Sequence, residues 1–324
     1  MALRWGLLST ARINTAILAA ASCSDEVAVV AVGSRDQARA EGYAREHGIG
    51  TAHGSYEALL ADPNVDAVYI SLPNGPHVEW SIRALEAGKH VLCEKPLTRR
   101  SADAAQAFDA ADAAGRLLME AFMWRHNPQT KAIARLVRDG AIGRLRLVRT
   151  AFSFTLDDPA DVRLEPALDG GALMDLGCYC ISAARLLAGE PVRVSGHAVT
   201  AADGVDRRFA ATLRHNADVL TTLDCGFDLP PRRELQAIGT EGVLSTSDPW
   251  HCSASRIDIR RPDGTAETIT VTPQDSYRLE LENFGAATRG TAEPLLGRED
   301  ALGQARTIEA LYASAAADGG ATTI

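Results

Sequence analysis

Short apolar runs alternate with segments of helical periodicity through the first 122 residues, and this alternation limits the fold more than any other feature of the chain. The run from Val27 to Val32 is apolar throughout, as in a parallel strand that is buried on both faces. Further strands are expected at 3–8, 67–72, 91–93 and 117–122, with helices at 11–21, 55–60, 77–87 and 102–114. Strand and helix in this order predict right-handed βαβ units and a doubly wound parallel sheet.

The pattern changes after residue 122. A helix is expected at 129–138, and later segments alternate polar and apolar residues: 145–154, 193–199, 209–214, 219–227, 234–238, 256–260 and 268–271. Strands with few helices between them predict a large, open, mostly antiparallel sheet, accompanied by helices at 171–187, 277–289 and 300–317. A chain of 324 residues is long enough for two cores, so we expect an α/β domain over 1–122 and an α+β domain over 123–324.

Composition excludes several classes of protein. The hydrophobic content of 46% and the charged content of 23% are ordinary for a soluble globular protein and indicate neither disorder nor a membrane span. A net charge of −9 without a Lys/Arg cluster argues against nucleic acid as a partner and favours a small, neutral substrate. The six cysteines lack metal-ligand spacing, which predicts a reducing, cytoplasmic environment and no metal site.

The turn after the first strand stands where a dinucleotide fingerprint would lie. Against G-x-G-x-x-G/A the chain has Gly6, Leu8 and Ala11, so the first and third positions match and the second does not. Ser9 and Thr10 would add hydroxyl donors for a pyrophosphate at the helix N-terminus, provided that Leu8 points into the core. An ordinary strand–helix turn fits the same residues.

The second strand ends at Gly33-Ser34-Arg35. Cofactor sites for NAD usually have a carboxylate at this position to accept the ribose 2′-hydroxyl, whereas a small residue followed by arginine leaves room for a 2′-phosphate. The sequence therefore favours NADP(H) over NAD(H), with Ser34 and Arg35 beside the phosphate. Asp36 is explained as a helix cap.

Two more strand ends carry polar residues at the carboxyl edge of the predicted sheet. Leu72-Pro73-Asn74 with His77 follows one strand, and Glu94-Lys95-Pro96 follows the next. Open α/β sheets bind ligands at this edge, so these side chains are candidates for the nicotinamide end of a cofactor site. Pro96 fixes its own φ and restricts Lys95, which keeps the lysine from entering a following helix. A turn and a solvated Glu-Lys pair explain the same residues without a ligand.

The helix expected at 171–187 carries a second candidate pair. Asp175 and Tyr179 are four residues apart, which places them on one face of an α-helix, one turn from each other. Gly170, Gly171 and Gly177 around them would permit close approach of another backbone or of a ligand. Taken alone, such a pair is more often a structural hydrogen bond.

Together these motifs resemble the Gfo/Idh/MocA oxidoreductases, and the match runs along most of the chain in the right order. The residues that carry it are Gly6 with Thr10-Ala11-Arg12-Ile13, Ser34-Arg35, Pro73-Asn74 with His77, Glu94-Lys95-Pro96, Glu120-Ala121-Phe122 with Arg125, and the segment from Gly170 to Tyr179. The chain is similar in particular to the NADP-linked branch that holds glucose-fructose oxidoreductase, D-xylose dehydrogenase and dimeric dihydrodiol dehydrogenase. Many relatives have histidine where this chain and that branch have tyrosine.

The resemblance implies a Rossmann domain, an open-faced C-terminal sheet, and hydride transfer between NADP(H) and a sugar carbon. It implies Lys95, Asp175 and Tyr179 as catalytic residues, and it makes Phe122, Trp124, Arg125 and Arg163 candidates for lining the substrate pocket. The full cofactor set is Gly6, Ser9, Thr10, Ala11, Arg12, Ile13, Ser34, Arg35, Leu72, Pro73, Asn74, His77, Glu94, Lys95 and Arg125.

The expected mechanism needs a general base and a cation but no metal. Tyr179 would accept the hydroxyl proton of the sugar, and the Lys95 ammonium would favour the phenolate of a side chain whose ordinary pKa is about 10. Asp175 would hold the lysine or a second sugar hydroxyl. The expected activity is that of an aldose 1-dehydrogenase with a D-xylose-like substrate.

Three alternatives stay open: a keto-sugar or anhydro-sugar reductase, a dihydrodiol dehydrogenase, and a regulator that binds cofactor and sugar without turnover. A sheet covered by helices on one side leaves its other face bare, and Val219, Leu223, Ala237 and Val243 are expected to make that face apolar. We therefore expect a homodimer through the C-terminal sheets, or a tetramer built on it.

Overall fold

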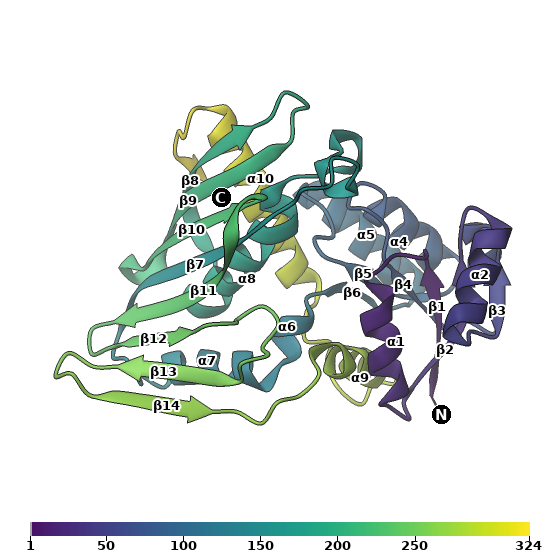
Figure 1. The fold of residues 1–324 in the computed structure, drawn as a ribbon, viewed down its shortest axis with the longest axis horizontal. Coiled ribbons are helices and arrows are strands. Elements are labelled where there is room, and N and C mark those ends of the chain that lie inside the picture. Colours follow the sequence, from purple (N-terminus) through teal and green to yellow (C-terminus); the bar gives the residue numbers. More distant parts are fainter. Residues whose placement is uncertain (1) are drawn as a thin grey trace. The chain divides into compact units, whose positions relative to one another are not determined.

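A computed structural model describes residues 2–324, and within them six strands form a parallel sheet with the order β3-β2-β1-β4-β5-β6 (Figure 1). The strands are β1 (Leu3–Leu8), β2 (Val27–Gly33), β3 (Thr51–His53), β4 (Ala67–Ile70), β5 (His90–Glu94) and β6 (Leu118–Ala121). The order reverses between β1 and β4, and the carboxyl ends of strands at such a switch point are where α/β sheets bind ligands. The doubly wound parallel sheet predicted from the sequence is confirmed.

The helices of this part are α1 (Asn14–Ser22), α2 (Gln37–His47), α3 (Tyr56–Leu60), α4 (His77–Glu86) and α5 (Ser101–Ala114). The explanation of Asp36 as a helix cap implied a helix here, but the extent of α2 was not predicted, because the helix is mostly polar and buries only small residues, Ala40 and Ala44. Its ends are nevertheless well marked. The Asp36 carboxylate accepts from the Arg39 amide at 2.7 Å, and Gly48 ends the helix with a left-handed φ of 67°.

In the second part of the described chain nine strands form a sheet with the order β14-β13-β12-β11-β7-β10-β9-β8-β15. The strands are β7 (Leu145–Thr155), β8 (Pro191–Thr200), β9 (Asp206–His215), β10 (Leu220–Gly226), β11 (Asp228–Gly239), β12 (Val243–Thr246), β13 (Arg256–Arg260), β14 (Ala266–Thr270) and β15 (Thr322–Thr323). β10 pairs with β7 in parallel and the other neighbours are antiparallel, which confirms the mostly antiparallel sheet.

Three strands of this sheet differ from the expectation for local reasons. β12 and β15 are four and two residues long, too short to give a periodic signal. β11 begins at Asp228, six residues before the predicted start, and passes through Pro230 and Pro231 where its register with β7 shifts. Prolines are tolerated in a strand at such irregularities.

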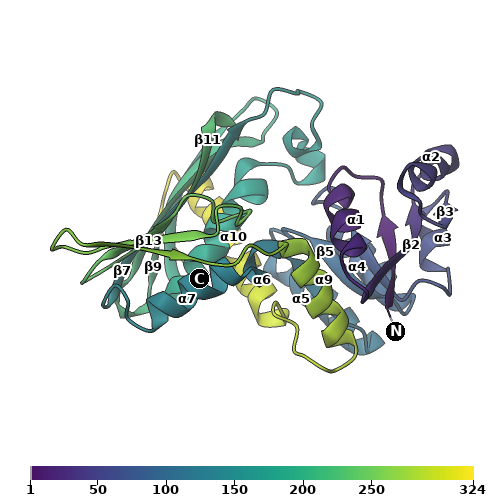
Figure 2. The same cartoon turned by 60° about the horizontal axis from the view of Figure 1, so that its bottom comes forward.

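Helices cover one face of the nine-stranded sheet. They are α6 (Met123–His126), α7 (Pro128–Arg138), α8 (Cys178–Ala188) and α10 (Arg298–Ala316), and Figure 2 shows α7 and α10 on the same side of the strands. The apolar stretch Pro166–Ala188 is long enough to cross a membrane by composition, but 78% of it is buried inside the protein. Its hydrophobicity is that of a core helix.

The expectation of which apolar residues line the bare face is largely wrong. Leu223 and Ala237 are buried, and the register places them with Val148 and Thr150 on the face that α8 covers. Val219 is also buried, whereas Val243 is half-buried and alternates to the opposite face. Period-two alternation identifies the two faces of a strand, but it does not say which face the helices choose.

The chain divides into two compact units that are discontinuous in sequence. The first holds the residues up to Thr98 together with 102–123 and 275–302, and the second holds 99–101, 124–274 and 303–324. Helix α9 (Ser276–Thr288) therefore belongs to the first unit, where the Phe284 ring lies 4.9 Å from that of Trp5. A single boundary near residue 122 separates the two sheets, but it assigns residues 275–302 to the second domain, whereas they belong to the first unit.

Candidate active site

The turn after β1 is built by side-chain hydrogen bonds rather than by a second glycine. Ser9 has a φ of 146°, a region that side chains rarely occupy, and its hydroxyl accepts from the Ala11 amide at 3.1 Å. The Asn14 amide donates to the Ser9 carbonyl at 2.8 Å. Leu8 is fully buried, as the fingerprint interpretation requires. A methyl group on Gly6 would lie 3.0 Å from Leu59, which explains glycine there.

A positively charged corner forms where β2 ends. Ser34 is buried at the strand end and Arg35 is exposed. Arg39, one turn later on α2, donates to the Thr10 hydroxyl at 2.9 Å and so reaches the fingerprint turn. Burial raises the pKa of Tyr56, and the charges of Arg35 and Arg39 oppose that rise, which locates both guanidinium groups near the same phenol. Arg39 was not predicted as a site residue, because Arg35 lies before the N-cap of α2 and Arg39 lies in its first turn, so their proximity depends on how the chain enters the helix.

The loops after β4 and β5 are tied together by His77. Its ring nitrogens lie 2.8 Å from the Leu72 carbonyl oxygen and 2.9 Å from that of Pro96. The side chain is fully buried. His77 therefore fixes the backbone on either side of the expected nicotinamide position. The Lys95–Pro96 peptide bond is cis.

Glu94, which precedes the candidate lysine, takes part in a network inside the first unit. Its carboxylate accepts from the Tyr69 hydroxyl and from the Lys95 amide at 3.1 Å. Tyr69 is fully buried, and burial next to Glu94 raises its pKa well above the ordinary value. The phenol is thus a neutral hydrogen-bond donor to Glu94.

The candidate pair of the second unit lies on an irregular helix. Residues Leu173–Gly177 form a π-helical turn, and α8 begins only at Cys178. Asp175 lies in the π turn and Tyr179 in the first turn of α8, so the single α-helix expected from 171 to 187 is wrong. π turns in helices occur frequently at functional sites, and periodicity in the sequence does not reveal them.

Glycine is needed before this turn because other groups crowd the backbone. A methyl group on Gly171, which has a φ of 138°, would lie 2.2 Å from the Asp206 carboxylate, and one on Gly170 would lie 2.4 Å from the Arg163 carbonyl. Asp206 in turn accepts from the Leu173 amide at 2.8 Å and from the Tyr312 hydroxyl at 2.9 Å. The carboxylate of β9 therefore caps the turn that carries Asp175.

Asp175 has a cationic neighbour in its own unit. Arg163 Nη1 lies 3.4 Å from the Asp175 carboxylate, and the same guanidinium makes a bidentate contact of 2.8 Å on each arm with Asp161. Its hydrogen bond to Asp161 raises the Arg163 pKa above the ordinary value. The guanidinium also lies 5.3 Å from the Phe154 ring. Arg163 is among the predicted site residues and Asp161 is not, because the approach of the two side chains depends on the loop conformation.

Tyr179 is surrounded by aromatic rings. It is 9% exposed, and its ring centroid lies 5.4 Å from Phe152 and 5.8 Å from Trp250. Trp124 packs edge-on against Trp250 at 5.5 Å and is itself buried. Trp250 and Phe152 were not predicted as site residues, since strand periodicity makes Phe152 a core position and Trp250 lies in a turn between β12 and β13.

The remaining predicted residues lie as follows. Phe122 is fully buried in the first unit. Arg125 donates to the Ser182 hydroxyl at 3.1 Å in the second unit, 5.9 Å from the Trp124 ring. Each unit thus gathers one half of the predicted residues: Lys95 with the fingerprint turn and strand ends in the first, and Asp175, Tyr179 and Arg163 in the second. Among residues 2–324 the structure has no cluster of three or more His, Cys, Asp or Glu side chains arranged to hold a metal.

Both units match known protein families. Residues 3–122 match the oxidoreductase family with an NAD-binding Rossmann fold, and residues 130–245 match the GFO/IDH/MocA C-terminal domain. The chain belongs to the Gfo/Idh/MocA family. It is therefore an oxidoreductase, and the fold class predicted from the sequence is confirmed.

Relatives of several specificities resemble this member of the family. It is 42% identical over 315 residues to a D-xylose 1-dehydrogenase (NADP(+)) of Haloferax volcanii, covering 96% of this chain and 97% of that protein. It is 34% identical over 260 residues to a trans-1,2-dihydrobenzene-1,2-diol dehydrogenase of Danio rerio, covering 79% and 77%. A 3-ketoreductase from Actinomadura kijaniata, solved with NADP and TDP-benzene, superposes with a TM-score of 0.92 at 32% identity, covering 97% and 98%.

Proposed function

We propose that this oxidoreductase transfers hydride between NADP(H) and a carbon of a small neutral sugar, and that its preferred reaction is oxidation of a D-xylose-like aldose at C1. The observation that carries this proposal is the setting of Tyr179, an ionisable phenol that is 9% exposed and packs against Phe152 and Trp250. Asp175, four residues earlier in the sequence, pairs with Arg163, and such an ion pair suits the hydroxyls of a sugar. The 42% identity to a D-xylose dehydrogenase supports the substrate class.

Proton transfer is assigned to the side chains of the chain itself. When bound, the nicotinamide accepts the hydride that leaves the sugar carbon. Tyr179, as phenolate, takes the proton of the reacting hydroxyl, and Lys95 orients that hydroxyl and stabilises negative charge on its oxygen. Asp175 and Arg163 hold neighbouring hydroxyls. Reduction of a carbonyl runs the same steps backwards.

The cofactor assignment rests on the charged corner at the end of β2. Ser34 puts no negative charge there, and Arg35 and Arg39 supply two guanidinium groups for the 2′-phosphate. Thr10, already bonded to Arg39, links this corner to the pyrophosphate turn. The NADP named with the xylose dehydrogenase and bound in the 3-ketoreductase supports the same choice.

A substrate panel tests the reaction. Purified protein is incubated with NADP and aldoses, and separately with NADPH and keto-sugars or dihydrodiols, while absorbance of the reduced nicotinamide is followed. Fastest turnover with D-xylose supports the proposal. Faster turnover with a keto-sugar or a dihydrodiol would instead identify the protein as a keto-sugar reductase or a dihydrodiol dehydrogenase. Absence of turnover in every arm would favour a regulator that only binds. Tyr179→Phe keeps the ring but removes the ionisable oxygen, so kcat should fall about 10²–10⁴-fold with NADP affinity nearly unchanged.

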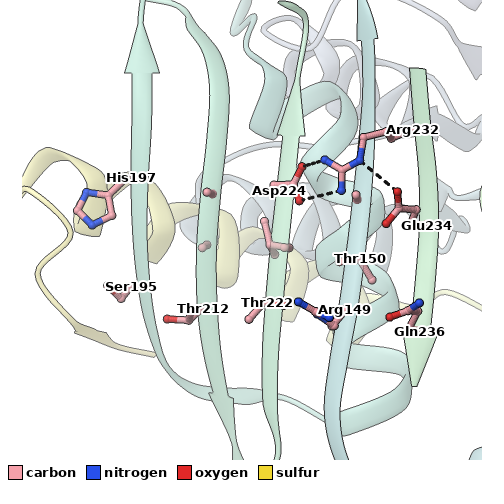
Figure 3. A pocket seen from close by; sticks show the side chains of 14 residues that line it. Arg149, Thr150, Ser195, His197, Thr212, Thr222, Asp224, Arg232, Glu234 and Gln236 are labelled. Atoms are coloured by element: carbon pink, nitrogen blue, oxygen red, sulfur yellow. Dashed lines mark hydrogen bonds and ion pairs between the residues drawn. The ribbon is translucent and has the colours of Figure 1, made fainter. Parts of the chain in front are cut away.

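A homodimer through the uncovered face of the nine-stranded sheet is part of the proposal. The register aligns Leu147, Leu220, Ile238 and Val243 in an apolar row across this face, and Leu220 is half exposed. Beside the row lies a hollow of ≈ 710 Å³ (Figure 3). Arg232 crosses the hollow between Asp224, at 2.6 Å, and Glu234, at 3.1 Å, as Figure 3 shows.

This surface suits a second copy of the same chain. A two-fold axis brings a row of apolar side chains onto itself, and charges of both signs on the face allow cross-pairing between copies. The residues in the described chain include six free cysteines, five of them buried, which is consistent with a cytoplasmic protein.

A further inference from the structure

A series of buried hydrogen bonds joins helix α10 to the start of helix α8. The side-chain amide of Gln304, on α10, donates to the Cys178 carbonyl at 2.8 Å, and its oxygen accepts from Arg185 Nη1 at 3.2 Å. All three residues are buried and lie in the second unit. The accepting carbonyl belongs to the peptide bond that leads into Tyr179, so Gln304 acts on the backbone at the base of that side chain.

The chemistry of its two partners fixes which way the Gln304 amide points. A guanidinium can only donate and a backbone carbonyl can only accept, so the amide oxygen faces Arg185 and the amide nitrogen faces Cys178. Arg185 is held in turn by a bidentate contact with Glu190, at 2.9 and 2.7 Å. A buried guanidinium needs such pairing, and forked, charge-assisted contacts are among the stronger hydrogen bonds in proteins. Arg185 therefore presents a fixed donor to Gln304.

The backbone of α10 leaves room for this arrangement. A methyl group on Gly303 would lie 2.2 Å from Arg185 Nη2 and 2.8 Å from the Glu190 carboxylate. Glycine inside a helix lowers the stability of the helix relative to alanine. Its presence here is explained by the guanidinium that passes close to the α10 backbone.

The turn before α8 needs support from outside the helix. A π turn can sit at neighbouring positions along a helix, because every residue there offers the same backbone groups. In this chain the π turn ends at Gly177 and the α-helical repeat begins at Cys178. A residue over which that change moved would rotate by about 100° around the helix axis. Asp175 lies inside the turn and Tyr179 just beyond it, so a shift would turn one of these side chains away from the other.

Side chains that are distant in sequence hold both ends of this turn. The Asp206 carboxylate, 33 positions away, accepts from the Leu173 amide at the start of the turn. Gln304, 126 positions away, donates to the Cys178 carbonyl at its end. Neither contact belongs to the hydrogen-bond ladder of the helix itself, so neither would move with the turn if it shifted.

We propose that Gln304, oriented by Arg185, is a positioning residue that holds the π turn in one place and so fixes the direction of the Tyr179 side chain. It acts through the backbone of Cys178 and not on the substrate. The inference rests on the proposed role of Tyr179 as the base of the reaction. It gives α10, a long helix that closes the chain, a part in the geometry of the site.

One isosteric substitution separates hydrogen-bond donation from packing. Gln304→Glu keeps the size of the side chain and its contact with Arg185, but a carboxylate beside a guanidinium is ionised and cannot donate to the Cys178 carbonyl. Gln106→Glu is the matched control, since it makes the same change at an exposed position of α5. In Gln304→Glu kcat should fall at least about tenfold with less than about threefold change in the KM for NADP, whereas the control should match wild type.

A double-variant cycle with Tyr179→Phe tests whether Gln304 acts through the phenol. If Gln304 only supports the fold, Gln304→Glu lowers kcat by the same factor in wild type and in Tyr179→Phe. If Gln304 positions the phenol, the effect of Gln304→Glu should largely disappear in Tyr179→Phe, because residues that act as a unit are not additive. Equal factors in the two backgrounds would overturn the inference.

Hydrogen–deuterium exchange gives a readout that does not need turnover. Without the Gln304 donor the end of the π turn opens more readily, so amides in peptides covering 171–182 should exchange at least about tenfold faster in Gln304→Glu than in wild type or Gln106→Glu. Gln304→Met, which can bond neither partner, should show the same increase and replaces the glutamate variant if that variant does not fold.

Two further results would contradict the inference. Unchanged exchange in both Gln304 variants would show that the π turn does not depend on this side chain. Faster exchange with unchanged kcat would show that the turn is held by Gln304 but that Tyr179 does not need it. If wild type turns over no substrate, the proposed function fails, whereas the exchange comparison still decides whether Gln304 holds the turn.

Discussion

Replacing Asp206 should disturb both the stability of the second unit and the geometry of Tyr179. The carboxylate is 4% exposed and accepts from the Leu173 amide at 2.8 Å and the Tyr312 hydroxyl at 2.9 Å. Asp206→Ala leaves both donors buried without this acceptor, and each such loss costs about 1–3 kcal/mol. Loss of a helix cap alone typically costs about 0.5–2 kcal/mol, so a total of roughly 3 kcal/mol is expected.

Two further variants separate the contributions that the two hydrogen bonds of Asp206 make to this loss of stability. Asp206→Asn keeps an oxygen for the Leu173 amide and should cost about 1 kcal/mol. Tyr312→Phe removes one donor and leaves the Asp206 carboxylate still accepting from the Leu173 amide, so it should also cost about 1 kcal/mol. Asp218→Ala is the control, because Asp218 is exposed and its pair with Arg214 is a surface salt bridge that should contribute no more than about 0.5 kcal/mol.

Urea unfolding followed by tryptophan fluorescence measures the effect, since Trp124 and Trp250 both lie in the second unit. The capped turn carries Asp175, so kcat of Asp206→Ala should also fall about 10–100-fold, while NADP affinity should stay near that of wild type. A loss of less than 0.5 kcal/mol in Asp206→Ala, or unchanged kcat with a full loss of stability, would refute the assignment of Asp206 as the support of this turn.

Three other predictions follow from the described contacts. Arg35→Ala and Arg39→Ala should each weaken NADP binding about tenfold with NAD binding nearly unchanged, and the double variant should abolish the preference; titration of cofactor fluorescence checks this, and a single variant that removes all preference would exclude a shared site. Leu220→Asp and Ile238→Asp should convert the proposed dimer to a monomer in sedimentation at micromolar concentration, and a wild-type monomer would rule out the sheet interface. Burial lowers the pKa of His126 to about 3, so its contribution to stability is present above the unfolded pKa of about 6.5 and is lost as the pH falls toward 3. The free energy of unfolding of His126→Gln should therefore rise relative to that of wild type by up to about 1.4 kcal/mol for each pH unit below 6.5. Acid-unfolding curves that run parallel for variant and wild type would contradict the burial argument.

The sequence by itself determines the first sheet and most of its ligand-binding edge. Uninterrupted apolar runs such as Val27–Val32 can be buried on both faces only between two layers of helices. The strand ends carry residues whose chemistry suggests a binding role, such as Ser34 and Lys95. The second sheet is also predicted, because period-two alternation persists over strands as long as β7. These signals are local, and local patterns can be read without knowing the partners of each segment.

Tertiary structure decides what depends on distant partners. Arg39 reaches Thr10 across 29 positions of sequence, and Asp206 caps a turn 33 residues before it. Leu223 lies on the covered face of the sheet because α8 packs there. The alternation of polar and apolar residues along a strand does not say which of the two faces a helix will cover. Phe284 of α9 packs against Trp5 of β1 because the chain returns to the first unit after leaving it, and no pattern near residue 284 encodes this contact.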